Sequence, residues 1–362
     1  MTRHGLGAFY PIFQDRENQN TPGYKPQHET HAWPIKGRPS FKASGQAYFK
    51  RLANEKCTHP IIPPIKAVAV FDTVGSLGVP TIRILGIPLY THSTREFAFT
   101  NTEVPSNIEH AYQALAIDEQ RAPFAPTVWE TPDAKSGAIL KELKQTWFPG
   151  VHSGVGGGYD DTSISDLTLA WMVTQLTPFL EFDNQYVLNQ QKQNVQFYKD
   201  KQTKDAQVQI RTWAMGWIQP NDGGLLNTLT GRQVRTPGEY HATSPETGKV
   251  LEQKLVKTCE FIHPSVRYRR DADGQGVTKN WKDHSVYRPA ALNGWDFAKS
   301  GSEDAEEIGG KQWKGYGKWV KKDKSGKVVQ YIVEDTIDEG TVEKQMLDAW
   351  PGVEQKLYPT VD

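Results

Sequence analysis

The chain has no excess charge of either sign. Its 42 lysine and arginine residues balance 42 aspartate and glutamate residues, so the formal net charge at pH 7 is zero. Proteins that attract nucleic acids or anionic membranes over a distance carry a clear positive excess. The sequence therefore argues against a nucleic-acid-binding function. For the same reason we interpret the small basic cluster of Arg267, Arg269 and Arg270 as a solvated face rather than an anion site.

Long apolar runs are also missing. No stretch approaches the roughly 20 apolar residues that a membrane-spanning helix needs, so we expect no integral membrane segment. The first residues, MTRHGLGAFYPIFQ, lack the apolar core of about 7–15 residues that a signal peptide contains. Together these absences predict a cytoplasmic protein.

Cysteine is scarce, and no pattern of metal ligands replaces it. The two cysteines, Cys57 and Cys259, are too few for a disulfide framework and match no metal-binding spacing. His28 and His31 stand three residues apart, but a zinc site needs three or four ligands and the sequence offers no third. The glycine loop at residues 154–158 has neither the G-K-[ST] of a P-loop nor the G-x-G-x-x-G spacing. We therefore expect no metal ion and no cofactor. The sequence pattern does not indicate an oligomeric state.

The apolar residues that are present predict an α/β fold. Residues 65–71 (IKAVAVF) form a short apolar run that is typical of a strand covered on both faces, and residues 143–148 predict a second strand. Apolar residues at the helical period of 3.6 predict helices over residues 5–18, 106–120 and 163–182. This order predicts a mostly parallel sheet with flanking helices.

The character of the sequence changes after residue 183. Turn signals then recur among scattered aromatic residues, which predicts a compact, irregular, aromatic-rich subdomain. The aromatic residues in question are Trp213, Trp217, Tyr240, Trp281, Tyr287 and Trp295. We therefore expect an α/β domain over residues 1–183, an aromatic-rich extension over 184–300, and a charged linker and tail over 301–362.

Two residues suited to acid–base chemistry follow the predicted strands. Asp72 comes directly after residues 65–71, and His152 comes shortly after residues 143–148, just before the glycine loop. Ligands of open α/β sheets bind at the carboxyl ends of the strands. Asp72 could equally cap the turn that it begins, and His152 could be a buried histidine satisfied by the backbone. The glycines beside His152 favour a functional role, because they permit close approach of a substrate.

The order of these residues matches part of a known catalytic arrangement. In α/β-hydrolases the triad residues occur along the chain as serine, then aspartate, then histidine. The histidine takes the proton of the serine hydroxyl, and the aspartate orients the imidazole and stabilises its charged form. The pairing of Asp72 with His152 is by itself a weak signal, since most proteins contain some aspartate and histidine in this order.

Several longer strings make the signal more specific because they resemble one family. They are similar to motifs of the α/β-hydrolases that include bacterial type VI secretion phospholipase effectors and many fungal proteins. The strings are AVAVFDTVGSLG (67–78), HAYQALAIDEQRAPFAPTVW (110–129), WFPGVHSGVGGGY (147–159) and ISDLTLAWM (164–172). Two later strings, RTPGEYHATSPETGK (235–249) and FIHPSVRYRR (261–270), resemble the C-terminal extension of the fungal branch. The resemblance implies a Ser-Asp-His hydrolase whose substrate is a lipid or another ester.

Carried over by position, the resemblance implies a role for particular residues. Asp72 matches the aspartate of the DTVGS-like motif and is our choice for the triad acid, and His152 matches the histidine of the WFPGVHS-like motif. Asp118 is the second choice for the acid, and His110 is the second choice for the base. One departure is Gly154, which stands where the family motif usually has an aspartate.

The nucleophile is the larger departure, because no G-x-S-x-G occurs in the sequence. Ser76 fails the spacing since Val74 stands where the first glycine belongs, and Ser153 lies too far from Gly150. In the family, the nucleophile precedes the segment that residues 5–18 resemble. We therefore predict an incomplete hydrolase sheet and a chain that is not a competent hydrolase as given. The alternative is a non-catalytic remnant or interaction protein on a hydrolase scaffold.

Overall fold

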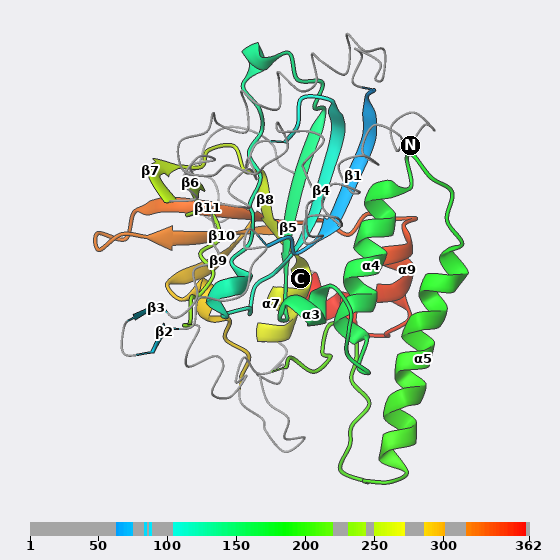
Figure 1. The fold of residues 1–362 in the computed structure, drawn as a ribbon. Coiled ribbons are helices and arrows are strands. Elements are labelled where there is room, and N and C mark those ends of the chain that lie inside the picture. Colours follow the sequence, from blue (N-terminus) through cyan, green and yellow to red (C-terminus); the bar gives the residue numbers. More distant parts are fainter. Residues whose placement is uncertain are drawn as a thin grey trace, which may run out of the picture.

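A single curled sheet forms the centre of the protein (Figure 1). The computed structural model describes residues 63–74, 83–84, 87–88, 104–219, 231–243, 250–271, 286–300 and 316–359. Within these segments seven strands form the sheet, in the order β1-β4-β5-β8-β11-β10-β9. They are β1 (Ile65–Phe71), β4 (Ile108–Ala116), β5 (Glu142–Phe148), β8 (Glu260–Ile262), β9 (Trp295–Lys299), β10 (Gly317–Lys322) and β11 (Val328–Glu334). Two separate pairs are β2 (Arg83–Ile84) with β3 (Ile87–Pro88), and β6 (His241–Thr243) with β7 (Val250–Lys254).

The strand directions confirm the predicted fold class. Strands β1, β4, β5, β8 and β11 are all parallel to their neighbours in this series. Strand β10 runs antiparallel to both β11 and β9. Figure 1 shows β9, β10 and β11 crossing the direction of β1, β4 and β5, so the sheet curls strongly from one edge to the other. The result is a mostly parallel α/β sheet, as a hydrolase-like fold requires.

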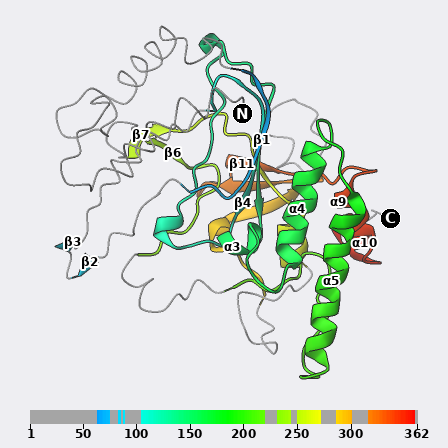
Figure 2. The same cartoon turned by 45° about the vertical axis from the view of Figure 1, so that its right-hand side comes forward.

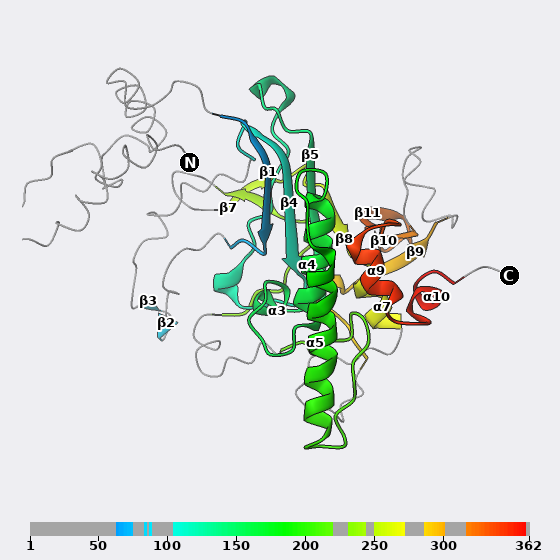
Figure 3. The same ribbon diagram turned by 90° about the vertical axis from the view of Figure 1, so that its right-hand side faces the viewer.

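Helices cover one face of this sheet. The α-helices are α3 (His152–Val155), α4 (Ser163–Leu176), α5 (Asn184–Gln202), α7 (Pro264–Asp271), α9 (Val342–Asp348) and α10 (Val353–Leu357). Short 3-10 turns are formed by Ala122–Phe124, Ala134–Ser136 and Ala290–Leu292. Helices α4, α5 and α9 pack against one another on the same side of the sheet (Figure 2). The short helix α3 lies close to the carboxyl ends of β1 and β4 (Figure 3).

Helix α4 illustrates how the sequence produces this packing. Its buried residues Ile164, Leu167 and Trp171 recur at the helical period, so they form one apolar stripe. The Trp171 ring meets the Phe148 ring of β5 edge to face, with centroids 5.5 Å apart. The stripe therefore holds α4 against the sheet directly beside the carboxyl end of β5.

Several predicted elements are confirmed. Strand β1 has the predicted bounds, β5 begins one residue before its predicted start, and α4 ends at Leu176 rather than at residue 182. The predicted helix over residues 5–18 lies outside the described residues. None of the helices in the described segments has the length and apolar character that crossing a bilayer requires.

The helix predicted over residues 106–120 is wrong, because this segment contains strand β4. Strand β4 lies between β1 and β5 and is buried along most of its length. A strand that is covered on both faces is apolar at almost every position, so Ile108, Ala111 and Leu115 also satisfy a helical spacing. Periodicity alone cannot separate a buried strand from a buried helix.

The C-terminal region contributes more to the sheet than its sequence suggests. Strands β8, β9, β10 and β11 come from it, so one sheet crosses both predicted domain boundaries, at residues 183 and 300. The expected aromatic cluster is present: Trp213, Tyr287 and Trp295 are buried in the main core, and Tyr240 packs against it. Trp281 lies outside the described residues.

The basic cluster that we expected to be solvated is largely buried. Arg267 donates to both carboxylate oxygens of Glu334, at 2.8 and 3.0 Å. Arg269 is fully buried and donates to the backbone oxygens of Ala214 and Gly216. The expectation was wrong because these acceptors are distant in the chain and leave no local trace in the sequence.

Candidate active site

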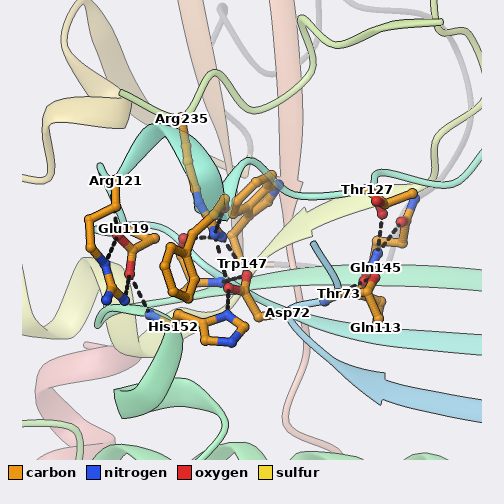
Figure 4. A network of polar contacts seen from close by, with 12 residues as sticks. Asp72, Thr73, Gln113, Glu119, Arg121, Thr127, Gln145, Trp147, His152 and Arg235 are labelled. Atoms are coloured by element: carbon orange, nitrogen blue, oxygen red, sulfur yellow. Dashed lines mark hydrogen bonds and ion pairs between the residues drawn. The ribbon is translucent and has the colours of Figure 1, made fainter. Parts of the chain in front are cut away.

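Asp72 and His152 meet at the carboxyl ends of two parallel strands (Figure 4). Asp72 follows β1, His152 begins α3 shortly after β5, and β4 lies between these strands. The distance from Asp72 Oδ2 to His152 Nδ1 is 2.6 Å. This value lies within the range of roughly 2.6–3.2 Å expected for a hydrogen-bonded acid–base pair. The two first-choice residues, 80 positions apart in the chain, are thus in direct contact.

The backbone turns sharply at Asp72 and aims its carboxylate across the end of β4. The residue has a φ of +44°, in the left-handed region that aspartate tolerates better than most residues. Its backbone N–H donates to the Ala114 oxygen at 2.7 Å, and its Oδ1 accepts from the Ala116 N–H at 2.8 Å. The side chain is completely buried, so these contacts fix the carboxylate in place.

His152 is held by a buried carboxylate that the sequence analysis missed. The backbone N–H of His152 donates to Glu119 Oε2 at 3.2 Å, and Glu119 also binds the Arg121 side chain. The Phe124 ring packs edge-on against the imidazole, with ring centroids 5.0 Å apart. The only sequence signal for Glu119 was its place in the ALAIDEQR string. The imidazole is 30% exposed, so one side of it remains open to a substrate.

The charge state of Asp72 results from opposing effects. Burial raises the pKa of its carboxyl group, but the Arg235 charge and the hydrogen bonds from His152, Arg235 and Ala116 outweigh burial and lower this pKa below its usual range. Asp72 is therefore ionised at neutral pH. A carboxylate in contact with Nδ1 favours the imidazole tautomer that carries its proton on that nitrogen. Arg235 begins the string at residues 235–249, and nothing in the neighbouring sequence predicts its contact with Asp72.

The second-choice residues lie apart from this pair. Asp118 Oδ2 accepts from the Gly150 N–H at 2.7 Å and from the Tyr287 hydroxyl at 2.8 Å, so it ties the loop before His152 to the core. His110 lies near the start of β4, where its Nδ1 is 3.4 Å from Glu142 Oε2. His110 is therefore not at the carboxyl ends of the strands, where Asp72 and His152 meet.

Asp118 gives a testable pH dependence of stability. Burial raises its pKa from 3.8 to about 6, although hydrogen bonds from Gly150 and Tyr287 oppose the shift. Between these pH values the folded state therefore binds a proton that the unfolded state has released. The stability that Asp118 contributes is fully present below about pH 4 and is lost as pH rises through about 6. Two units correspond to about 3 kcal/mol. In urea denaturation from pH 4 to 7.5, wild type should lose about this much more than Asp118→Asn, and parallel profiles would contradict the assignment.

The glycine loop shapes the backbone around His152. Gly150 has a φ of +116°, a conformation that other residues rarely adopt, and a Cβ there would lie 3.2 Å from Ile164. At Gly154, where the family motif has an aspartate, the nearest side-chain atoms to a Cβ would be at 3.9 and 4.0 Å, so a Cβ would make only ordinary van der Waals contacts. Within the ranges that the structure describes, no group of three or more histidine, cysteine or acidic residues could hold a metal ion. His28 and His31 lie outside those ranges.

Comparison with known families places this geometry in context. A family model described as the catalytic domain of Tle1-like type VI secretion phospholipase effectors matches residues 2–175. The matched segment, slightly less than half of the chain, is similar to this family. It includes β1, β4, β5 and α3, and thus both Asp72 and His152. No curated protein and no solved structure matches the chain. The Tle1-like match supports a phospholipase-like or lipase-like function.

Proposed function

We propose that the chain carries the acid and base of a serine ester hydrolase that acts on lipid esters. The observation that carries this proposal is the 2.6 Å contact between Asp72 and His152 at neighbouring strand ends. The Tle1-like match supports a lipid as the substrate class. Ester hydrolysis of this kind needs a carboxylate, an imidazole and a hydroxyl nucleophile in series.

The geometry suits two of these three roles. Asp72 holds the imidazole through Nδ1, so Nε2 is the nitrogen that would take the proton from an attacking serine hydroxyl. His152 would then give this proton to the departing alcohol, while the buried carboxylate stabilises the imidazolium between the two steps. The complete burial of Asp72 and the partial exposure of His152 fit these roles, because only the base must reach the substrate.

The serine is the member that we expect this chain to lack, since no G-x-S-x-G occurs among the 362 residues. Without a nucleophile, catalytic triads retain only a small residual rate. We therefore expect no hydrolysis of a short-chain nitrophenyl ester, or of phosphatidylcholine vesicles, above the rate of the His152→Ala variant. His110→Ala serves as a matched control, because His110 lies away from the pair. Turnover that depends on His152 would show that another residue of this chain is the nucleophile.

The proposed role itself is tested by adding coding sequence upstream of Met1, where a strand followed by G-x-S-x-G in frame would supply the serine. If such a segment is encoded, His152→Ala in the extended protein should lower kcat by at least about 1,000-fold, as in other triads. His110→Ala should leave kcat close to wild type. Full activity in His152→Ala would contradict the assignment of the base.

A second candidate function is binding without catalysis. The absence of G-x-S-x-G from the sequence favours it, because a scaffold that only binds does not need a nucleophile. The same upstream coding sequence separates the two possibilities. If no segment with a nucleophile is encoded there, and the chain still binds phosphatidylcholine vesicles, the binding function is the better account.

A further inference from the structure

A buried arginine from beyond the family-matched segment contacts the carboxylate of Asp72. The Arg235 side chain is 2% exposed, and its Nη1 and Nη2 donate to Asp72 Oδ1 and Oδ2 respectively, the second at 2.9 Å. The same two nitrogens donate to backbone oxygens, Nη1 to Ala116 at 2.6 Å and Nη2 to Phe124 at 2.9 Å. The guanidinium is thus fixed at four points (Figure 4).

We propose that Arg235 is a positioning residue for the Asp72–His152 pair, which it serves by fixing the carboxylate plane and compensating its charge. The catalytic meaning of this inference rests on the function proposed above. Residue 235 lies outside the matched residues 2–175, so the C-terminal region would complete the site of the Tle1-like domain.

The guanidinium fixes the plane of the Asp72 carboxylate. Each carboxylate oxygen of Asp72 receives one guanidinium hydrogen bond and one other, from Ala116 N–H on Oδ1 and from His152 on Oδ2. Two parallel bonds to a planar guanidinium prevent the carboxylate from rotating about its own axis. The oxygen that faces His152 Nδ1 is therefore held where the imidazole needs it.

The same arginine also braces the other side of the imidazole. Its Nη2 holds the backbone oxygen of Phe124, and the Phe124 ring packs edge-on against His152. Its Nη1 holds the last residue of β4, Ala116. The Arg235 side chain thus connects Asp72, the carboxyl end of β4, and the Phe124 residue that packs against the imidazole.

The positive charge of Arg235 also affects how readily the pair binds a proton. A buried carboxylate without compensation strongly favours the protonated form of a neighbouring imidazole, commonly by about 1–3 pH units. An imidazolium cannot act as a general base. Because Arg235 offsets the charge of Asp72, it lowers the pH at which the pair takes up a proton. That proton belongs to the coupled pair, so the expectation holds whichever partner carries it.

The experiment is an NMR titration of the imidazole nitrogens in the chain as given, with His152→Gln identifying the signal. Arg235→Gln should raise the titration midpoint of the pair by about 1–3 pH units. Arg235→Lys should shift it less, since the charge remains while the two-point contact is lost. Arg232→Gln is the matched control, because Arg232 lies three residues earlier, is exposed, and donates to the side-chain oxygen of Gln120 rather than to the pair. An unchanged midpoint in Arg235→Gln would overturn the proposal.

A second comparison covers the case in which Arg235→Gln does not fold. In Asp72→Asn the guanidinium faces His152 without a carboxylate, so the His152 midpoint should be low. Adding Arg235→Gln removes that charge and should raise the midpoint, and equal midpoints in the two proteins would overturn the proposal. The readout needs no activity. A shifted midpoint without hydrolysis in the longer protein would count against the proposed function alone, and hydrolysis with an unshifted midpoint would count against Arg235 alone.

Discussion

Replacing Arg267 by methionine is expected to lower the free energy of unfolding by about 3–5 kcal/mol. Arg267 makes a two-point contact with Glu334 and donates from Nη1 to the Leu357 oxygen at 2.8 Å. Both side chains are almost completely buried. Burial raises the pKa of Glu334, and the Arg267 hydrogen bonds and charge oppose this rise. Methionine fills most of the volume but leaves a buried carboxylate without its counter-charge.

Urea denaturation at pH 7, followed by tryptophan fluorescence, measures this loss. Arg270→Met is the matched control on the same helix, since Arg270 is partly exposed and pairs with the exposed Asp271. We expect it to cost less than Arg267→Met, because Asp271 is exposed to solvent and needs no counter-charge when Arg270 is replaced. Arg267→Met with Glu334→Leu should recover much of the loss, because no unpaired charge remains. A cost for Arg267→Met no larger than that of the control would contradict the buried-pair interpretation.

The sequence predicted the strands that carry the candidate site because their signals are local. Residues 65–71 and 143–148 are short apolar runs, the first preceded by prolines and the second followed by Pro149 and Gly150, and each precedes a residue that can do chemistry. Parallel strands bring their carboxyl ends to one edge of the sheet, so the placement of Asp72 and His152 on that edge follows from the fold class. Their direct contact across β4 requires the strand order, which no local pattern reveals.

The buried arginines could not be predicted because their partners are remote. Arg235 meets Asp72 across 163 residues, and Arg267 meets Glu334 across 67. A lone arginine in a sequence is far more often exposed than buried. Strand β10, with the sequence GKWVKK, gave no strand signal either, since its lysines obscure the alternation. The sequence therefore did not predict the contacts between residues that are distant in the chain.

The candidate site also departs from the usual relation between activity and stability. Catalytic residues often strain a fold, so replacing them commonly stabilises the protein. Asp72 has such strain, with a φ of +44°, but it is also the counter-ion of the buried Arg235. Replacing Asp72 therefore has two opposite effects on the free energy of unfolding. The larger of the two decides whether the protein is stabilised or destabilised. Leaving a buried charge unpaired costs about 3–5 kcal/mol, whereas left-handed strain is worth about 1–2 kcal/mol.

Asp72→Ala is therefore expected to destabilise the protein by at least about 3 kcal/mol, because alanine keeps the strained backbone and abandons Arg235. Asp72→Asn should cost less, since its amide oxygen can still accept from the Ala116 N–H and asparagine tolerates a positive φ. Asp72→Asn with Arg235→Gln should cost less than the sum of the single variants, because the buried charge leaves with its partner. Urea denaturation of these four variants and wild type at pH 7 measures the costs. Wild type, Asp72→Asn, Arg235→Gln and the double variant form a double-mutant cycle. An Asp72→Ala protein as stable as wild type would mean that Arg235 does not depend on this carboxylate, and additive costs would mean that the two side chains are not coupled.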